Sequence, residues 1–256
     1  MISDNIEIFI LSLIQGVSEF LPVSSSAHLV LFSEYYEFNN QNLLIDISLH
    51  LGSLIAIIFY FRRDLFNFVQ NKSFLIKIIL GTIPIIPVGY ILYKTELINF
   101  LRSLEVIGWM SLIFGILLYI SDKYKITKKI DTEFTNSSAI IIGLFQVLAL
   151  IPGVSRSGIT ITSGRLLGFN RLDSAKISFF LSIPTLGAAS LLGIYNIYKE
   201  GNAELNFLAI IAVLFSFIFS YVTISLFLNF IKKFSLNLFV IYRIVLSLLI
   251  LAMVYL

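Results

Sequence analysis

The sequence has no cysteine and few charged side chains. Without cysteine, the chain can form neither a disulfide framework nor a thiolate metal site. Only 13% of its 256 residues are charged and 58% are hydrophobic, whereas soluble domains are about 25% charged and about 45–50% apolar. The net charge of +3 comes from short basic clusters rather than from a continuous basic face. The composition therefore predicts an integral membrane protein with no nucleic-acid partner.

Two further features are missing from the chain. Its first residues, Met-Ile-Ser-Asp-Asn-Ile-Glu, are acidic and have no small-residue cleavage site, so we expect no cleaved signal peptide. The length of 256 residues suits one compact membrane domain, 1–256, without a soluble module.

Long apolar runs predict an all-α protein with six transmembrane helices, since about 20 apolar residues in a helix cross the hydrocarbon core. The expected spans are 43–61, 73–93, 104–121, 176–195, 207–231 and 236–256. Two other apolar stretches, 6–36 and 137–170, are each interrupted by a proline followed by serines. Non-helical backbone at membrane depth must be buried in protein or line a water-filled cavity. We therefore expect both stretches to be re-entrant helical hairpins.

Basic clusters in the loops predict the orientation. They occur at Arg62, Arg63 and Lys72, at Lys123, Lys125, Lys128 and Lys129, and at Lys232 and Lys233. The expected spans put all three clusters on one face, which the positive-inside rule makes cytoplasmic. Both termini then lie outside, the first hairpin opens outward and the second opens inward. This arrangement predicts inverted repeats, about 1–121 and about 130–256, with a site where the interrupted segments meet.

The first hairpin carries a carboxylate, Glu19, whose burial in a membrane costs free energy. Gln15 and Glu19 are four residues apart and share one helix face. A polar seam that joins helices is one interpretation, but serine or glutamine would fill that role without the cost of a carboxylate. A buried glutamate also suits a general base or a hard divalent cation, which prefers oxygen ligands. We therefore take Glu19 as catalytic and Gln15 with Glu19 as a candidate cation site.

Pro22 ends the first half of this hairpin, and three serines follow where a new helix would begin. Ser24, Ser25 and Ser26 each suit an N-cap, but three hydroxyls at a helix N-terminus also make an anion site. His28 lies one turn further on and is either a hydrogen-bonded core residue or a proton shuttle.

Asp46 and His50 repeat the four-residue spacing on the next span. They either orient the catalytic groups or form an interhelical hydrogen-bonded pair.

The second hairpin contains Pro152-Gly-Val-Ser-Arg-Ser-Gly158, in which Arg156 lies between the hydroxyls of Ser155 and Ser157. Arginine presents a planar fork of donors that matches phosphate oxygens. Snorkelling to an interface explains Arg156 poorly because the preceding apolar run places it deep. Arg165, Arg171 and Arg243 suit positions near a membrane surface better. If the two hairpins meet tip to tip, Glu19, the serines and His28 lie opposite Arg156, a combination that suits phosphoryl chemistry.

The segment from Gln15 to His28 resembles the (E/Q)xxxE motif and the following serine–histidine segment of bacterial undecaprenyl-diphosphate phosphatases, the bacitracin-resistance BacA/UppP family. Residues 152–160 match the PGxSRSxxT motif of that family in full, which adds Thr160 to the phosphate-binding candidates Ser24, Ser26, Ser155, Arg156 and Ser157. Asp46 to Ser53 and 183–187 also look like this family, so the resemblance covers essentially the whole chain. Ala27 departs from a common glycine, and Gln15 leaves one carboxylate fewer for a cation.

The resemblance implies removal of the terminal phosphate of undecaprenyl diphosphate, which recycles the lipid carrier for peptidoglycan synthesis. It implies Mg²⁺ or Ca²⁺, a multi-pass protein of the bacterial cytoplasmic membrane, and a site that faces the periplasm. Carried over by position, the central residues are Gln15, Glu19, Ser25, His28 and Arg156.

Several alternatives stay open at this point. Inverted repeats are also a transporter architecture, so a polyprenyl-phosphate flippase is the rival function. The sequence does not decide between attack by water and a phospho-enzyme on Ser25 or His28. It also leaves open the preferred lipid chain length and the oligomeric state, including a homodimer.

Overall fold

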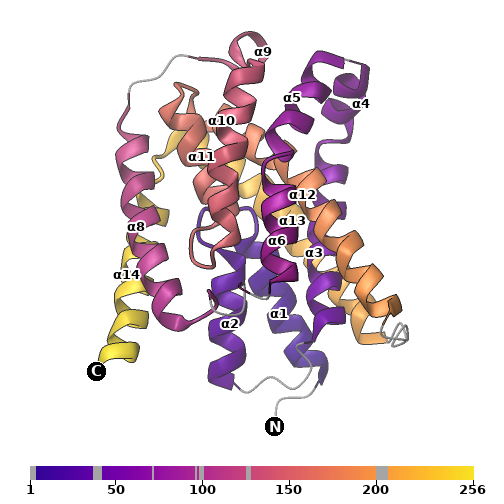
Figure 1. Cartoon of the computed structure of the whole chain (residues 1–256), viewed down its shortest axis with the longest axis vertical. Helices are drawn as coiled ribbons and strands as arrows, with labels where there is room; N and C mark the ends of the chain where they lie inside the picture. Colours follow the sequence, from indigo (N-terminus) through magenta and orange to yellow (C-terminus); the bar gives the residue numbers. More distant parts are fainter. Residues whose placement is uncertain are drawn as a thin grey trace.

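The computed structural model describes residues 4–36, 42–70, 72–95, 97, 101–124, 128–199 and 207–256. Every regular element in these ranges is a helix (Figure 1). In the first half these are α1 (Asp4–Ser18), α2 (Ser25–Tyr36), α3 (Leu43–Tyr60), α4 (Arg62–Gln70), α5 (Lys72–Thr82), α6 (Ile85–Lys94) and α8 (Leu104–Asp122). In the second half they are α9 (Ile130–Glu133), α10 (Asn136–Val147), η1 (Leu148–Leu150), α11 (Arg156–Leu166), α12 (Arg171–Lys199), α13 (Phe207–Lys233) and α14 (Asn237–Tyr255).

The prediction of six spans is confirmed. Six stretches of the described chain are long and apolar enough to cross a membrane: Leu43–Tyr60, Lys72–Lys94, Leu104–Asp122, Arg171–Tyr195, Phe207–Lys233 and Asn237–Tyr255. Polar side chains cap the first turns of several helices. At the start of α3, Asn42 Oδ1 accepts from Ile45 N at 3.0 Å, and at the start of α10, Thr135 Oγ1 accepts from Ser138 N at 3.2 Å. The span expected over 73–93 is divided into α5 and α6 just before Pro84, whose ring removes a backbone donor.

The stretches expected to be re-entrant are pairs of short helices. The 15 residues of α1 rise about 22 Å, less than the roughly 30 Å of a hydrocarbon core. The helices α2 and α11 are shorter still, with 12 and 11 residues. Figure 1 shows α1 and α2 in the lower half of the molecule and α10 and α11 in the upper half, with their turns facing each other. The geometry fits two hairpins that enter from opposite ends.

Close backbone contacts hold the first hairpin and α3 against α13. A Cβ at Gly16 would lie 2.5 Å from Phe219 Cβ, and one at Gly52 would lie 2.4 Å from the carbonyl oxygen of Val213. Only glycine allows helices to approach so closely, as is common where membrane helices pack. Hydroxyls reinforce this contact, since Ser220 donates to Ser53 Oγ at 2.9 Å.

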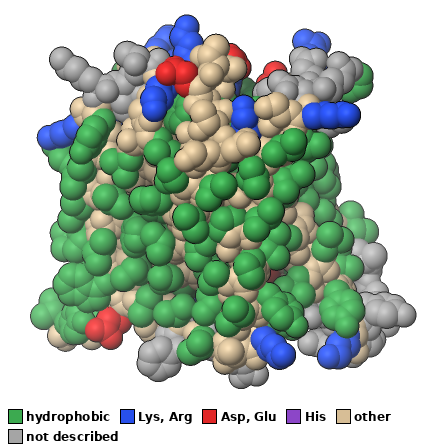
Figure 2. Space-filling view, turned by 45° about the horizontal axis from the view of Figure 1, so that its top comes forward, with side chains coloured by type: hydrophobic (Ala, Val, Ile, Leu, Met, Phe, Trp, Pro, Cys, Tyr) green, Lys and Arg blue, Asp and Glu red, His purple; other side chains and the backbone are tan. Residues whose placement is uncertain are grey.

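The outer surface is apolar in its middle and charged at its ends (Figure 2). Exposed residues of this belt include Ile55 and Phe59 of α3, Leu226 of α13 and Leu249 of α14. At the upper end in Figure 1 lie α4, which carries Arg62 and Arg63, the start of α5 at Lys72, and α9, which Lys128 and Lys129 directly precede. Lys125 of the second cluster lies outside the described residues. The start of α1 and the end of α14 both lie at the opposite, lower end.

Candidate active site

Two turns with the same backbone form the centre of the molecule. Ser24 (φ 75°) and Ser155 (φ 70°) are the only non-glycine residues of the described chain with positive φ. Each follows a valine and directly precedes a helix, α2 at Ser25 and α11 at Arg156. Non-glycine residues seldom adopt this conformation, and such residues cluster at functional sites. The shared geometry makes Ser25 and Arg156 equivalent positions of the two hairpins.

Direct hydrogen bonds join the two turns. Ser157 donates to the carbonyl oxygen of Leu21 at 2.6 Å. The guanidinium of Arg243 donates to Gly153 O at 2.8 Å and to Val154 O at 3.1 Å in one turn, and to Pro22 O at 3.4 Å in the other. The expectation that Arg243 lies near a membrane surface is therefore wrong. Its side chain is 1% exposed, and it fastens the two hairpin tips from α14.

Glu19 lies where the hairpins meet. Its Oε1 accepts from Arg156 Nη2 at 3.0 Å in an ion pair between side chains that are 6% and 13% exposed. Its Oε2 accepts from Ser25 Oγ at 2.7 Å and from Gln15 Nε2 at 2.9 Å. The carboxylate therefore contacts a hydroxyl of its own hairpin and the guanidinium of the other. A carboxylate at this distance from a hydroxyl can accept its proton.

Hydrogen bonds from Nη1 and Nη2 hold the Arg156 guanidinium in place. Nη1 donates to the carbonyl oxygen of Ser178 in α12 at 3.2 Å, while Nη2 is paired with Glu19. Nε has no hydrogen-bond partner among the described residues. The guanidinium is thus fixed in direction, and an anion that reached it would compete with Glu19 for Nη2.

The other predicted phosphate-binding hydroxyls differ in their surroundings. Ser24 and Ser26 contact each other at 3.4 Å, and Ser26 is exposed. Ser155 caps α11, because its Oγ accepts from Gly158 N at 3.1 Å. Thr160 is fully buried and donates to the hydroxyl of Ser178 at 2.7 Å, so it faces α12. In this structure Ser155, Ser157 and Thr160 shape the turn that carries Arg156.

His28 is engaged at both ring nitrogens. Nδ1 lies 2.6 Å from Ser24 O, and Nε2 lies 2.5 Å from the hydroxyl of Tyr242 in α14. The two rings stack at 5.6 Å with 9° between their planes. Because a carbonyl only accepts, Nδ1 carries a proton. The structure therefore brings His28 to Tyr242 and to the tip backbone rather than to Glu19.

Asp46 and His50 of α3 lie beside this centre. His50 Nδ1 lies 2.7 Å from the backbone oxygen of Asp46, so the contact between these two residues involves the main chain of Asp46. The side chains of Arg156 and His50 are both close enough to Glu19 to interact with it electrostatically. His50 can therefore act on the Glu19 carboxylate, and a supporting role for Asp46 and His50 in the site stays a prediction.

The proposed cation ligands are one amide oxygen and one carboxylate. Gln15 Oε1 is buried and has no hydrogen-bond partner among the described residues, although the amide nitrogen donates to Glu19. Within the described residues no three His, Cys, Asp or Glu side chains are grouped as a metal cluster. Mg²⁺ is commonly held by one or two carboxylates together with water and substrate phosphates. Gln15 and Glu19 fit a cation that takes its remaining ligands from a bound diphosphate.

The sequence profile described as "Bacitracin resistance protein BacA" matches residues 8–249. The chain belongs to the BacA family. A Pelagibacter ubique protein named undecaprenyl-diphosphatase is 53% identical over the whole of both chains. Proteins of the same name from Hahella chejuensis and Dinoroseobacter shibae are 42% and 40% identical, over 94% and 97% of this chain and 95% and 98% of their own.

Three residues of this site were not predicted to belong to it from the sequence. Ser178 and Tyr242 are ordinary helix residues in the sequence, and their contacts with Arg156 and His28 join distant segments. Arg243 did carry a signal, because it is the only charged residue in the apolar run 236–256. A charge inside an apolar span indicates a buried functional or structural role by default.

Proposed function

We propose that the protein is a membrane-embedded undecaprenyl-diphosphatase that removes the terminal phosphate of its lipid substrate. The observation that carries this proposal is the contact of Glu19 with both Ser25 Oγ, at 2.7 Å, and Arg156 Nη2, at 3.0 Å. A nucleophile, a base within hydrogen-bond reach and a fixed anion clamp are the parts that phosphoryl transfer needs. The names of the relatives supply the substrate, and the apolar belt suits its polyprenyl tail.

In the first step Ser25 is the nucleophile. The diphosphate takes donors of Arg156, which frees Glu19 from its ion pair. Ser25 Oγ attacks the terminal phosphorus while its proton passes to Glu19. The bond between that phosphorus and the bridging oxygen breaks, and the proton moves on to the departing lipid monophosphate. His28 is the weaker candidate nucleophile because Tyr242 contacts its Nε2 and Ser24 contacts its Nδ1.

In the second step water attacks the phosphoserine. Glu19 accepts a proton from that water, the Ser25 Oγ–phosphorus bond breaks, and the proton returns to Ser25. Inorganic phosphate leaves and the hydroxyl is restored. Arg156 stabilises the negative charge on the transferred oxygens in both steps, as fixed donors do in sites from which water is excluded.

A divalent cation, Mg²⁺ or Ca²⁺, belongs to the proposal, with Gln15 Oε1 and Glu19 as its protein ligands. When bound, it would neutralise the negative charge of the diphosphate. The unpartnered amide oxygen of Gln15 supports this assignment.

The site favours an enzyme over a flippase. A carrier needs a phosphate clamp, which Arg156 alone would supply, but it has no use for a hydroxyl bonded to a carboxylate. The Ser25–Glu19 hydrogen bond is therefore the feature that separates the two functions.

We further propose that the protein lies in the bacterial cytoplasmic membrane with its site open to the exterior. The basic clusters at the end that carries α4, α5 and α9 support this orientation.

Phosphate release by the purified protein tests the function. Detergent-solubilised protein should release inorganic phosphate from a polyprenyl diphosphate, lose this activity with a chelator and regain it with Mg²⁺ or Ca²⁺. If a protein that folds and binds the lipid releases no phosphate with either cation, it is not a phosphatase. Release that a chelator leaves unchanged would remove only the cation from the proposal.

A further inference from the structure

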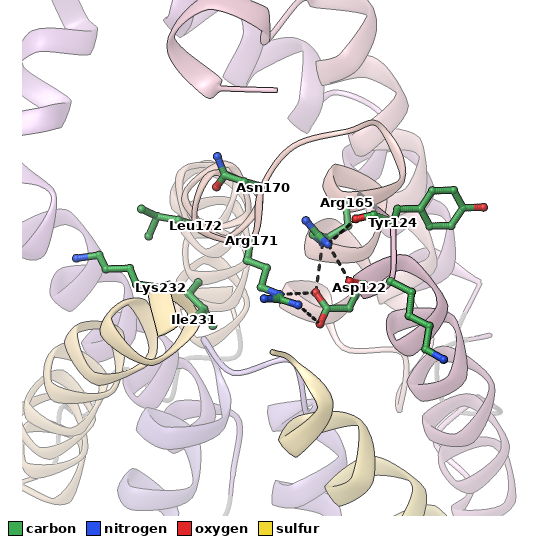
Figure 3. A pocket seen from close by; sticks show the side chains of 9 residues that line it. Asp122, Tyr124, Arg165, Asn170, Arg171, Leu172, Ile231 and Lys232 are labelled. Carbon is green, nitrogen blue, oxygen red and sulfur yellow. Dashed lines mark hydrogen bonds and ion pairs between the residues drawn. The ribbon is translucent and has the colours of Figure 1, made fainter. Parts of the chain in front are cut away.

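A charged cavity, apart from the active site, lies at the end of the molecule with the basic clusters. Its volume is about 580 Å³, within the range of small-molecule sites. Its walls come from the last turns of α8, α11 and α13 and the first turn of α12 (Figure 3). Arg165 in this wall and Arg156 in the active site are nine residues apart on α11, so about 13 Å of helix separates them.

Cationic side chains outnumber carboxylates in this cavity. Arg165, Arg171, Lys123 and Lys232 line it, against the single carboxylate of Asp122. Arg171 binds Asp122 with two hydrogen bonds, from Nε at 2.7 Å and from Nη2 at 3.0 Å. The carboxylate also accepts from Leu236 N at 3.0 Å. The Asp122 carboxylate is therefore already hydrogen-bonded, and its single negative charge does not balance the four cationic side chains, so the cavity keeps a net positive charge.

Two of the cations keep donors for a ligand. Arg171 Nη1 has no partner among the described residues, and the Arg171 side chain is 34% exposed. Within the described chain, the ammonium of Lys232 donates to the neutral amide of Asn229, at 3.3 Å, and has no ion-pair partner. Arg165, in contrast, donates to the backbone oxygens of Asp122 and Tyr124 and is structural. An arginine edge and a lysine without an ion-pair partner suit a phosphate group.

The surroundings point to a lipid rather than a soluble anion. The cavity lies at the ends of membrane-spanning helices, where lipid headgroups are found, and Leu172 and Ile231 give it an apolar part. Leu226, five residues before Ile231 in α13, is 65% exposed and belongs to the lipid-facing belt. Basic pockets between transmembrane helices on the cytoplasmic side are typical binding sites for anionic headgroups.

We propose that this cavity binds the phosphate of an anionic phospholipid headgroup, with Arg171 and Lys232 as its main contacts. The proposal is independent of the phosphatase reaction, because none of these side chains touches the active site.

Stabilisation by lipid tests it. The thermal midpoint of detergent-solubilised protein is measured while phosphatidylglycerol, phosphatidylcholine or inorganic phosphate is added. Phosphatidylglycerol should raise the midpoint, and the other two should not. In Lys232→Gln the phosphatidylglycerol concentration for half of the effect should rise about fivefold, as expected for one lysine near a membrane surface. Phosphate release from polyprenyl diphosphate should stay unchanged.

Lys233→Gln is the matched control, since it removes the same charge from the same helix end but lies outside the cavity wall. Its response to phosphatidylglycerol should equal that of the wild type. Arg171→Lys is a second variant that keeps a charge opposite Asp122 while it removes the fork. Equal effects of Lys232→Gln and Lys233→Gln, or equal stabilisation by phosphatidylcholine, would overturn the proposal. Stabilisation by inorganic phosphate that Lys232→Gln weakens would assign the cavity to a free anion instead.

Discussion

Replacement of Ser25 by alanine separates a catalytic hydroxyl from one that only starts a helix. The Ser25 hydroxyl gives Glu19 one of its three hydrogen bonds, at 2.7 Å. Gln15 and Arg156 keep the other two, so the carboxylate stays partnered in Ser25→Ala. Hydrogen bonds to charged groups contribute about 1.5–3 kcal/mol. Because Ser25 is only half-buried, we expect a loss of unfolding free energy at the lower end of this range.

The expected effect on turnover is far larger. The variant lacks both the proposed nucleophile and the proton that Glu19 would accept from it. Its kcat should therefore fall by at least the roughly 10²–10⁴-fold that general base catalysis alone contributes. A small change in stability with a large change in kcat identifies a group that acts in the transition state.

Ser26→Ala is the matched control. Ser26 lies in the first turn of the same helix but is exposed, and the one hydrogen bond of its hydroxyl within the described residues is to Ser24 Oγ, at 3.4 Å. It should keep its kcat and lose at most the roughly 1 kcal/mol of a helix cap. Initial rates of phosphate release and thermal midpoints of Ser24→Ala, Ser25→Ala and Ser26→Ala are measured side by side. Equal, mild losses at all three positions would refute the reasoning, because the serines would then only begin α2.

Other variants test the remaining parts of the account. Arg156→Lys should recover little of the activity lost in Arg156→Ala, with kcat still roughly 10²–10³-fold below wild type, because a point charge does not replace the fork; near-normal rates would exclude two-donor recognition. Glu19→Gln should lower kcat by roughly 10²–10⁴-fold while the protein still folds, and a variant that keeps its rate but melts earlier would make Glu19 a structural residue. The orientation is tested in intact cells, because the chain has no cysteine of its own. Leu256→Cys should react with a membrane-impermeant thiol reagent, and Lys129→Cys should not. The reverse pattern would mean that the protein has the opposite orientation.

Much of the architecture could be predicted from the apolar runs in the sequence and from the polar residues that interrupt them. The spans were visible as apolar runs, and Glu19 and Arg156 were visible as charges that lipid would not tolerate. The proline and serines that interrupt both stretches marked the places of the two turns, although not the positive φ that Ser24 and Ser155 share. These features depend on local composition, which the sequence records directly.

Contacts between distant segments were not predictable in this way. Tyr242 is 214 residues from His28, and no local pattern indicates that their side chains meet. Arg243 lies a few residues from the start of α14, a position that also suits snorkelling to an interface. Which interpretation holds depends on the neighbours that α14 packs against, and these are the two hairpin tips.

The central claim is that phosphate passes through Ser25 on its way to water. The stereochemical course at phosphorus tests this claim most directly, with a polyprenyl diphosphate that is chiral at its terminal phosphorus through oxygen isotopes and sulfur. Transfer to Ser25 and then to water comprises two in-line displacements, each of which inverts the phosphorus, so the account predicts net retention of configuration. Net inversion would mean a single displacement by water and would contradict Ser25 as the nucleophile.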